Sequence, residues 1–354
     1  MMTFSIPAVM TAMVLTGHGD YDKLAYRHDV PVPRPRAGEV LIRVGAAGLN
    51  NTDINTRIGW YAPAGVGVDT PPREGGWNGA IGFPRIQGAD VCGTIVAAGA
   101  GVQAGRIGER VIVQPCLRSL RQGRRDAWLG SEVDGGFAQF TCVPAPDAYR
   151  IESPLSDAEL ATFPCAYATA ENLLGRSGVA AGERVLITGA SGGVGAACVQ
   201  LARRRGAEVI AVASGRHADR LEALGAARLV PRGAALASHV PPDSVDAVID
   251  VVGGPSWPDL LDVLRPRGRY AVSGAVAGPI VSLDLRKLYL KDLCFFGCTS
   301  QDDGVFERLV GALESGDIRP LLAAAYPLSE LARAQQDFLA RAQFGKLVVV
   351  PPQA

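Results

Sequence analysis

The stretch from Arg184 to Ala213 constrains the fold of this chain more than any other part. It reads RVLITGASGGVGAACVQLARRRGAEVIAVA, a pattern that predicts a buried strand, a glycine-rich turn, a helix and a second strand. Glycine at 192 lets the backbone approach the pyrophosphate of a dinucleotide, and glycine at 195 lets the helix lie against the first strand. The helix would direct its N-terminal amides at the phosphates. We therefore expect a dinucleotide site here.

The glycines alone would be weak support, because the first glycine of the usual G-x-G-x-x-G pattern is Ala190 in this chain. The flanking strands and helix carry the prediction, and a tight turn in another kind of α/β protein is the alternative. The predicted cofactor contacts in this turn are Ala190, Ser191, Gly192, Gly193, Val194 and Gly195.

The end of the second strand indicates which dinucleotide is bound. NAD-binding proteins place Asp or Glu there for the ribose 2′-hydroxyl. This chain has Ser214-Gly215-Arg216-His217 instead. A carboxylate would repel a 2′-phosphate, whereas the Ser214 hydroxyl and the Arg216 guanidinium would bind it through charge-assisted hydrogen bonds. The sequence therefore predicts NADP(H), and Arg220 either assists or is a solvated helix charge.

The pattern of the chain changes near residue 157, which predicts two domains. Between residues 38 and 150, short β-branched or alternating segments bounded by Gly or Pro predict a β-rich unit. From residue 157, a helical segment precedes apolar strands that alternate with helices, which predicts a parallel sheet covered by helices. The Gly/Pro-rich stretches 62–84 and 116–136 predict long loops.

The charge balance favours a small-molecule partner. Lys and Arg together number 35, as do Asp and Glu, so no long-range field would attract nucleic acid or an anionic membrane. No stretch approaches the roughly 20 apolar residues needed to span a bilayer, and the N-terminus lacks the pattern of a signal peptide. Seven cysteines scattered along the chain are typical of a protein whose thiols stay reduced. We expect a cytoplasmic protein that binds neither nucleic acid nor membrane.

Short sequence blocks spread over almost the whole chain point to one known family. They are GEVLIRVGAAGLNNTD, GFPRIQGADVCGTIVAAGAGV, IGERV, GGFAQF, ASGGVG, LEALGA, DVVGG, LRPRGRYAVSGA and FGKLVVVP. In this order they resemble the medium-chain dehydrogenase/reductase superfamily, and within it the zinc-free quinone oxidoreductase branch that includes zeta-crystallin. The resemblance implies an α/β fold with two domains. A GroES-like, β-rich catalytic domain would cover residues 1–156, completed by residues 300–354, and a Rossmann domain, a doubly wound parallel sheet that binds NADP(H), would cover residues 157–299.

The positions that hold catalytic zinc in the alcohol dehydrogenases of this superfamily carry other residues here. Asn50 stands where those enzymes have Cys, and Ala89 where they have His. An amide and a methyl group cannot replace a thiolate and an imidazole. Cys165 falls at the third position, where the alternative is a small buried hydrophobe. The four cysteines of the superfamily's structural zinc lobe are represented by Cys116 alone, so we predict no metal site.

The resemblance also implies which residues meet the substrate and the nicotinamide. Asn50 either donates a hydrogen bond to the substrate or caps a helix. Asp53, the third candidate catalytic residue, is expected to cap or brace the following turn rather than to transfer protons, and to pair with Arg57. Tyr61 is expected to donate a hydrogen bond or a proton. Trp60, Tyr61 and Trp77 either cover the substrate pocket or anchor a surface loop. The remaining predicted cofactor contacts are Thr169, Val252, Gly253 and Gly274.

Three functions stay open at this stage. The first is an NADPH-dependent reductase of quinones or α,β-unsaturated carbonyl compounds that works without zinc. The second is a zinc alcohol dehydrogenase whose ligands lie elsewhere, and the third is an NADPH-binding protein that has lost catalysis. The segment from Lys291 to Thr299 resembles the edge strand through which relatives form homodimers, with an internal strand as the alternative.

Overall fold

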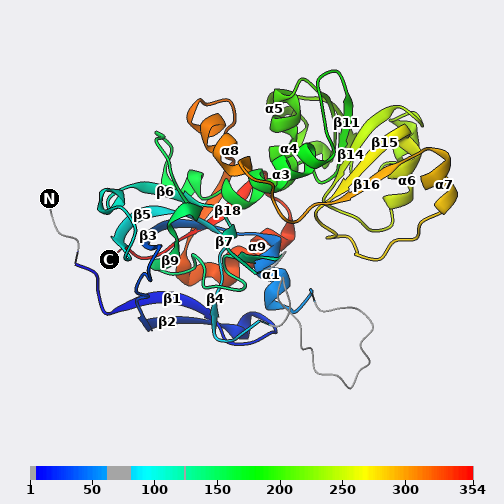
Figure 1. The fold of residues 1–354 in the computed structure, drawn as a ribbon. Helices are drawn as coiled ribbons and strands as arrows, with labels where there is room; N and C mark the ends of the chain where they lie inside the picture. Colours follow the sequence, from blue (N-terminus) through cyan, green and yellow to red (C-terminus); the bar gives the residue numbers. More distant parts are fainter. Residues whose placement is uncertain (1–4, 62–80, 123–124, 354) are drawn as a thin grey trace. The chain divides into compact units, whose positions relative to one another are not determined.

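The structure, a computed structural model, describes residues 5–61, 81–122 and 125–353, and it divides into two compact units (Figure 1). Unit 1 comprises Met1–Cys165, Pro320–Ala342 and Lys346–Ala354. Unit 2 comprises Ala166–Arg319 and Gln343–Gly345. Each unit has its own sheet and hydrophobic core.

Unit 1 is the β-rich unit expected from residues 38–150. Its main sheet contains β3 (Glu39–Gly48), β5 (Asp90–Ala98), β6 (Arg110–Val113), β9 (Phe140–Pro144), β10 (Ala148–Arg150), β17 (Leu322–Pro327) and β18 (Lys346–Val350). The strand order is β10-β6-β5-β3-β18-β17, with β9 also paired to β3. A smaller sheet contains β1 (Val9–Leu15), β2 (Leu24–Pro31) and β4 (Arg85–Ile86). The helices of this unit are α1 (Asn51–Arg57), α2 (Asp157–Leu160) and α9 (Leu331–Ala340).

The prediction of a long loop over residues 116–136 is wrong for its first half. There β7 (Cys116–Gln122) and β8 (Arg125–Trp128) form an antiparallel hairpin. The pairing shifts register between Leu117 and Gln122, which breaks the two-residue alternation by which a strand is recognised. Of the other predicted loop, residues 62–80 lie outside the described residues.

Unit 2 contains the predicted Rossmann sheet. It contains β11 (Arg184–Ile187), β12 (Glu208–Ala213), β13 (Ala226–Pro231), β14 (Val245–Asp250), β15 (Leu264–Val272) and β16 (Cys294–Gly297). All pairings are parallel in the order β13-β12-β11-β14-β15-β16, so the chain reverses its direction of winding between β11 and β14. Ligands of such sheets bind outside the carboxyl ends of the strands at this reversal.

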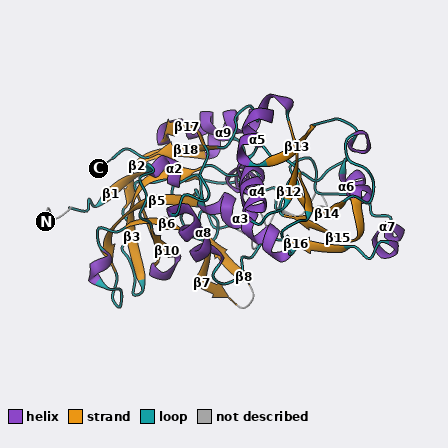
Figure 2. Ribbon diagram, turned by 90° about the horizontal axis from the view of Figure 1, so that it is seen from above, coloured by secondary structure: helices purple, strands orange, loops and turns teal. Residues whose placement is uncertain are grey.

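Helices cover the sheet of unit 2, as its continuous apolar strands require. The helices between residues 164 and 319 are α3 (Pro164–Arg176), α4 (Gly193–Arg204), α5 (Ala218–Leu224), α6 (Trp257–Val263), α7 (Leu285–Leu290) and α8 (Val305–Glu314), and of these α4, α5 and α6 pack on the strands of the sheet. Helix α4 packs on β11 and β12, α5 on β13, and α6 on β15 (Figure 2). The buried side of α4 is lined by small and aliphatic side chains, which lets the helix lie close to the strands.

The helical segment predicted from residue 157 is two helices rather than one. The expected start after Ser156 is confirmed by a capping box, in which Glu159 N donates to Ser156 Oγ and Ser156 N donates to Glu159 Oε2. The chain leaves the helix at residue 161, and α3 begins at Pro164, since proline lacks an N–H group and is tolerated only in a first turn.

A buried carboxylate fixes the chain just after β14. Asp250 is fully buried and accepts hydrogen bonds from Thr188 Oγ1 at 2.5 Å and from Tyr270 Oη at 2.6 Å. It also accepts from the backbone N–H groups of Val252 at 2.8 Å and Gly253 at 3.1 Å. Burial, together with the neighbouring Asp250 charge, raises the pKa of Tyr270, so its hydroxyl stays protonated and donates.

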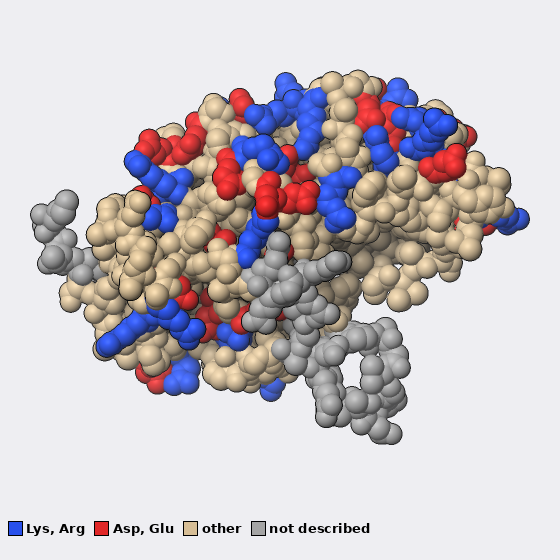
Figure 3. Space-filling model, in the orientation of Figure 1, with Lys and Arg blue, Asp and Glu red and all other residues tan. Residues whose placement is uncertain are grey.

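Charges of both signs lie interspersed on the face shown in Figure 3, in keeping with the zero net charge. Among the helices within residues 5–61, 81–122 and 125–353, none is long and apolar enough to cross a membrane.

Replacing Tyr270 with Phe will destabilise unit 2. The substitution removes one donor from the buried Asp250 carboxylate, and a hydrogen bond to a charged group contributes about 1.5–3 kcal/mol. Chemical unfolding followed by fluorescence should show a loss of this size in the free energy of unfolding. Tyr289→Phe is the matched control, because Tyr289 is 62% exposed and its loss of a hydroxyl should change stability by less than about 0.5 kcal/mol. Equal losses in both variants would contradict the assigned hydrogen bond.

Candidate functional site

The glycine-rich turn lies between β11 and α4. Gly189 follows the strand with φ of 58°, a left-handed conformation that favours glycine. A Cβ on Gly195 would lie 2.2 Å from the Gly189 carbonyl oxygen, so only glycine lets α4 approach the strand this closely. A Cβ on Gly192, just before the helix, would meet nothing closer than the Gly189 oxygen at 3.4 Å. The turn therefore has room for a phosphate at the N-terminus of a twelve-residue helix, which fits a dinucleotide.

The other predicted residues of the turn lie around this space. Ala190 is buried, and its N–H donates to the Val212 carbonyl oxygen at 3.1 Å, which ties the turn to β12. Ser191, Gly193 and Val194 are half-buried, and Gly192 is exposed. A pyrophosphate could reach these four residues, since none of them is fully buried.

Of the remaining predicted cofactor contacts of unit 2, all but Thr169 lie beside the turn. A Cβ on Gly189 would lie 3.1 Å from the side chain of Val252, and Gly253 follows in the loop held by Asp250. A Cβ on Gly274 would lie 2.8 Å from the Val251 carbonyl oxygen, so the chain after β15 packs on the chain after β14. Thr169 lies half-buried on α3. The carboxyl ends of β11, β14 and β15 thus bring these glycine and valine positions together.

Positive charges gather at the end of β12. Ser214 is half-buried and precedes a short 3-10 turn that carries Arg216 and His217. Burial lowers the pKa of His217, and the nearby Arg216, Arg220 and Arg232 guanidinium groups lower it further. The imidazole is therefore neutral near pH 7, and the positive charge of the cluster lies on the three guanidinium groups. A cluster of this kind suits a phosphate dianion.

Phe344 packs beside His217 and Arg220 in unit 2. Its ring lies 5.3 Å from the His217 ring, and the Arg220 guanidinium lies 5.6 Å above it. Arg220 is therefore held against an aromatic ring rather than being a purely solvated helix charge.

In unit 1, Asn50 lies in a buried polar cluster with Asp90 and Lys346. The Lys346 Nζ donates to Asn50 Oδ1 at 2.7 Å and to Asp90 Oδ2. The Asn50 Nδ2 donates to Asp90 Oδ2 at 2.9 Å, and Cys165 N donates to Asp90 Oδ1 at 2.6 Å. Asn50 is 8% exposed, Lys346 3% and Asp90 0%, so the ion pair and the amide share a site shielded from water.

Asp53 braces the start of α1 and not the turn that follows it. Its carboxylate accepts from Asn50 N at 2.8 Å and Gly88 N at 3.3 Å. Burial raises the pKa of Asp53 to about 7, although these two backbone bonds and the Lys346 charge lower it in part. The carboxyl group therefore titrates near neutral pH.

The predicted pairing of Arg57 with Asp53 is wrong. The Arg57 guanidinium donates instead to Gln335 Oε1 at 3.0 Å and to the Gly19 carbonyl oxygen at 2.8 Å, and it lies 4.3 Å above the Tyr21 ring. The Asp53 carboxylate is occupied by backbone amides, and Arg57 binds segments that are distant in the sequence.

Tyr61 lies in the same unit, half-buried, with Asn55 Nδ2 donating to its hydroxyl at 3.5 Å. Burial raises the pKa of Tyr61, and the nearby Cys165 and Asp53 raise it further, so the phenol keeps its proton near neutral pH. Its ring packs edge-on against Trp60 at 5.4 Å. Trp77, predicted beside them, lies outside the described residues.

The residues at the expected zinc position do not fit a metal. Ala89 is buried and offers no ligand atom. The Asn50 oxygen and one Asp90 oxygen accept from the Lys346 ammonium, whose positive charge opposes a divalent cation at the same oxygens. Within the parts of the chain that the structure describes, no three His, Cys, Asp or Glu side chains are spaced to hold a metal ion.

Sequence reasoning missed Lys346, Asp90 and Arg232. Lys346 lies in the block FGKLVVVP, where a single charged residue begins an otherwise apolar strand, and this was the available signal. Asp90 follows Ala89 at the start of a buried strand. Arg232 follows β13, and nothing in the local sequence links it to the end of β12.

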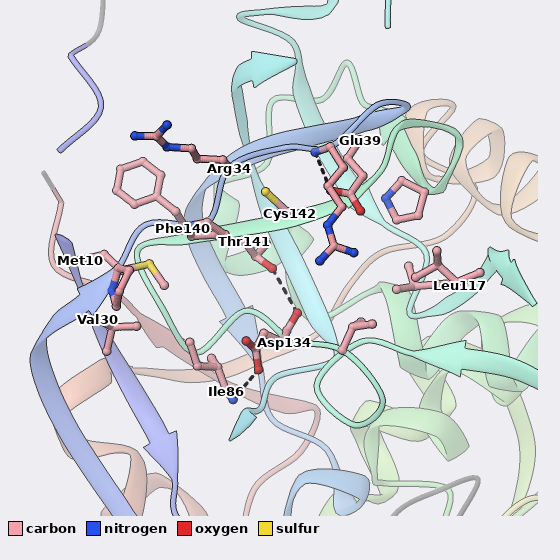
Figure 4. Close-up of a pocket in the computed structure, with 16 residues that line it drawn as sticks. Met10, Val30, Arg34, Glu39, Ile86, Leu117, Asp134, Phe140, Thr141 and Cys142 are labelled. Carbon is pink, nitrogen blue, oxygen red and sulfur yellow. Dashed lines mark hydrogen bonds between the residues drawn. The ribbon is translucent and has the colours of Figure 1, made fainter. Parts of the chain in front are cut away.

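A cavity of about 330 Å³ also lies in unit 1 (Figure 4). Its walls include Met10, Leu117 and Phe140, and none of its lining residues is a predicted site residue. Its two carboxylates are already hydrogen-bonded: Asp134 accepts from Ile86 N and from Arg85, and Glu39 accepts from Arg36 N. We therefore assign no ligand to this cavity.

Two family descriptions match the chain. Residues 36–153 match the alcohol dehydrogenase GroES-like domain, and residues 193–315 match the zinc-binding dehydrogenase. The first match lies in unit 1 and the second in unit 2.

Curated relatives match along nearly the whole chain. The acryloyl-coenzyme A reductase of Metallosphaera sedula is 29% identical over 96% of this chain and 99% of its own length. The quinone oxidoreductase of Rattus norvegicus is 28% identical over 97% of this chain and 98% of its own. The chloroplastic NADPH-dependent alkenal/one oxidoreductase of Arabidopsis thaliana is 28% identical over 98% of this chain and 81% of its own.

A solved structure also matches the chain. A Sinorhizobium meliloti 1021 protein, provisionally named an alcohol dehydrogenase, is 47% identical, with 98% of each chain covered and a TM-score of 0.91. The fold of the two units and these similarities show that the chain belongs to the medium-chain dehydrogenase/reductase superfamily, in its quinone oxidoreductase branch, a family of oxidoreductases that bind a nicotinamide cofactor.

Proposed function

We propose that this protein uses NADPH to reduce quinones or α,β-unsaturated carbonyl compounds, and that it does so without a catalytic zinc. The observation that carries the proposal is the Asn50, Asp90 and Lys346 cluster, in which an amide and an ion pair stand at the zinc position. Without a Lewis acid, the easiest acceptors are those whose carbonyl is conjugated with a C=C bond. The names of the relatives, which include quinone, alkenal/one and acryloyl reductases, support this substrate class.

Unit 1 supplies the groups that would meet the substrate. The Asn50 amide would donate a hydrogen bond to the oxygen on which charge develops. The Tyr61 hydroxyl, protonated at neutral pH, would donate a second hydrogen bond or the proton that completes the product. Asp53 would act indirectly, since its carboxylate holds the Asn50 backbone N–H.

Unit 2 supplies the groups that would hold NADP(H). The turn from Ala190 to Gly195 would bind the pyrophosphate, and Ser214 and Arg216 the 2′-phosphate. Thr169, Val252, Gly253 and Gly274 would line the path to the nicotinamide. When bound, the reduced nicotinamide supplies a hydride, so an enone gains two electrons and a C–H bond at its β-carbon, a quinone gains two electrons and an O–H bond, and a proton from the protein or water balances either product.

The exposed edge of the unit 2 sheet supports a homodimer. Strand β16 is the last strand of the sheet order, so the segment from Lys291 to Thr299 contains an edge strand and not an internal one. Apolar side chains nearby in the sequence are exposed, among them Ile280 at 79%, Leu285 at 64% and Leu290 at 71%. Pairing two such edges would bury this surface. We further propose that the homodimer is cytoplasmic, in keeping with its seven scattered cysteines, none of which forms a disulfide bond in the structure.

The purified protein should oxidise NADPH when a 1,4-quinone or an enone is added, with no metal supplied. The rate should be unchanged by a chelator, because the cluster at the zinc position lacks a ligand set. Loss of NADPH absorbance measures the rate, and elemental analysis measures zinc. Stoichiometric zinc with chelator-sensitive activity would support an alcohol dehydrogenase instead, and tight NADPH binding with no turnover across a broad panel would support a protein without catalysis.

Replacing Arg216 with Gln should weaken NADPH binding about 10–100-fold and leave NADH binding nearly unchanged, since a charge-assisted hydrogen bond to the 2′-phosphate contributes about 1.5–3 kcal/mol. Calorimetric titration with each nucleotide measures the two dissociation constants. Arg308→Gln, an exposed arginine on α8, is the control and should change neither. A parallel loss for both nucleotides in the Arg216 variant would argue against recognition of the 2′-phosphate.

Light scattering of the purified protein should give the molar mass of a dimer, which is twice the chain mass of 37.0 kDa. Leu290→Lys should shift the protein toward monomer, because it places a charge on the exposed apolar surface beside β16. Leu339→Lys changes a comparably apolar residue on α9, 44% exposed in unit 1, and should leave the mass unchanged. A monomeric parent protein would overturn the proposed dimer.

A further inference from the structure

We propose that Lys346 and Asp90 are positioning residues that lock the Asn50 amide in one orientation, with its nitrogen available to donate to the substrate oxygen. What the amide does in catalysis rests on the proposed function, whereas how the amide is held rests on the cluster alone. The two parts can be tested separately.

The polarity of the two charged partners decides the orientation of the amide. An ammonium has only donors, and an ionised carboxylate has only acceptors. Asn50 lies between them, with Lys346 Nζ 2.7 Å from Oδ1 and Asp90 Oδ2 2.9 Å from Nδ2. Exchanging the amide oxygen and nitrogen would place two donors face to face at Lys346 and two acceptors face to face at Asp90. Only one orientation satisfies both partners.

The amide keeps one weakly bonded donor after these bonds are made. The Asn50 Nδ2 carries two hydrogens, and one is used by Asp90. The other donates to the Gly48 carbonyl oxygen over a long 3.5 Å. Because this bond is weak, the second N–H group can bind a substrate oxygen instead without breaking the contact to Asp90.

The strand register brings the three residues together. Gly48 of β3 pairs with Asp90 of β5 and with Val348 of β18, so Asn50 lies just beyond the point where the three strands meet. A Cβ on Gly48 would lie 2.3 Å from the Ala161 carbonyl oxygen and 2.9 Å from Asp90 Oδ2, so glycine is needed for this approach. The partners of the amide are therefore held by the sheet itself.

Burial strengthens the hydrogen bonds that fix the orientation of the Asn50 amide. Asp90 is 0% exposed and Lys346 3%, and hydrogen bonds in such a low-dielectric site are stronger than in water. Asp90 is held in turn by Cys165 N, which donates to its other oxygen at 2.6 Å. The carboxylate therefore has little freedom to rotate away from the amide.

The double variant Asp90→Asn/Lys346→Met tests the lock without leaving one buried charge unpaired. Both side chains become neutral at nearly constant volume, and the Asn50 amide loses the charges that fix its polarity. With NADPH and an enone, kcat should fall about 10–100-fold while KM changes by less than about 3-fold, as expected for a donor that acts in the transition state. Thermal unfolding of the same sample establishes that the variant is folded.

The same double variant in an Asn50→Ala background separates positioning from a general structural effect. If Lys346 and Asp90 act through the amide, removing them from Asn50→Ala should lower kcat by less than about 2-fold further. Multiplicative losses would overturn the proposal. Asp262→Asn/Lys287→Met neutralises a half-buried ion pair of unit 2 in the same way and should leave kcat unchanged.

An NMR measurement tests the lock independently of turnover. The chain has five asparagines, so selective ¹⁵N labelling gives few side-chain signals, and the Asn50 pair is the one lost in Asn50→Ala. In the parent protein this pair should exchange slowly with D₂O, and in Asp90→Asn/Lys346→Met at least about 10-fold faster. Equal exchange rates would overturn the lock, whereas a protected amide in a protein that turns over no enone or quinone would overturn only the proposed function.

Discussion

The ion pair between Lys346 and Asp90 is the interaction on which the candidate site of unit 1 depends. Removing an ammonium and a carboxylate from water costs several kcal/mol per ion, and only good geometry with further hydrogen bonds offsets this. Both conditions hold, because Asp90 accepts from Lys346, Asn50 and Cys165 N. Since the pair joins β5 to β18 beside the end of β3, the site can form only when the C-terminal strand is in place.

The fold of unit 2 could be predicted from the sequence because its determinants are local. The strand, glycine turn, helix and second strand lie within residues 184–213, and each buried strand is a continuous apolar run. The glycine at 195 is required by a contact only six residues away, at Gly189. In unit 1, by contrast, the break before Pro164 and the β7–β8 hairpin were not predicted, since a short helix and a strand with irregular register lack a clear period.

The site of unit 1 could be predicted only in part, because its contacts are distant in the sequence. The family pattern identified Asn50, but Lys346 is 296 residues away from it, and no local pattern links the two. The partner of Arg57 is also distant in the sequence. Its spacing from Asp53 suits a helical ion pair, yet its side chain binds Gln335, 278 residues away. Tertiary partners outweigh such local pairs, which contribute only about 0.2–0.5 kcal/mol.

The difference between a held amide and a metal ion bears on the kind of substrate. A metal polarises an oxygen strongly and can stabilise an alkoxide, whereas a single positioned donor contributes about 2.7–4 kcal/mol to the transition state. A site of the second kind therefore suits an acceptor that spreads charge over several atoms, as a quinone or an enone does, because less charge remains on the oxygen to be stabilised. In the proposed reaction, the fixed polarity of Asn50 favours this class further, since the locked amide presents a donor, which matches a substrate oxygen that gains charge.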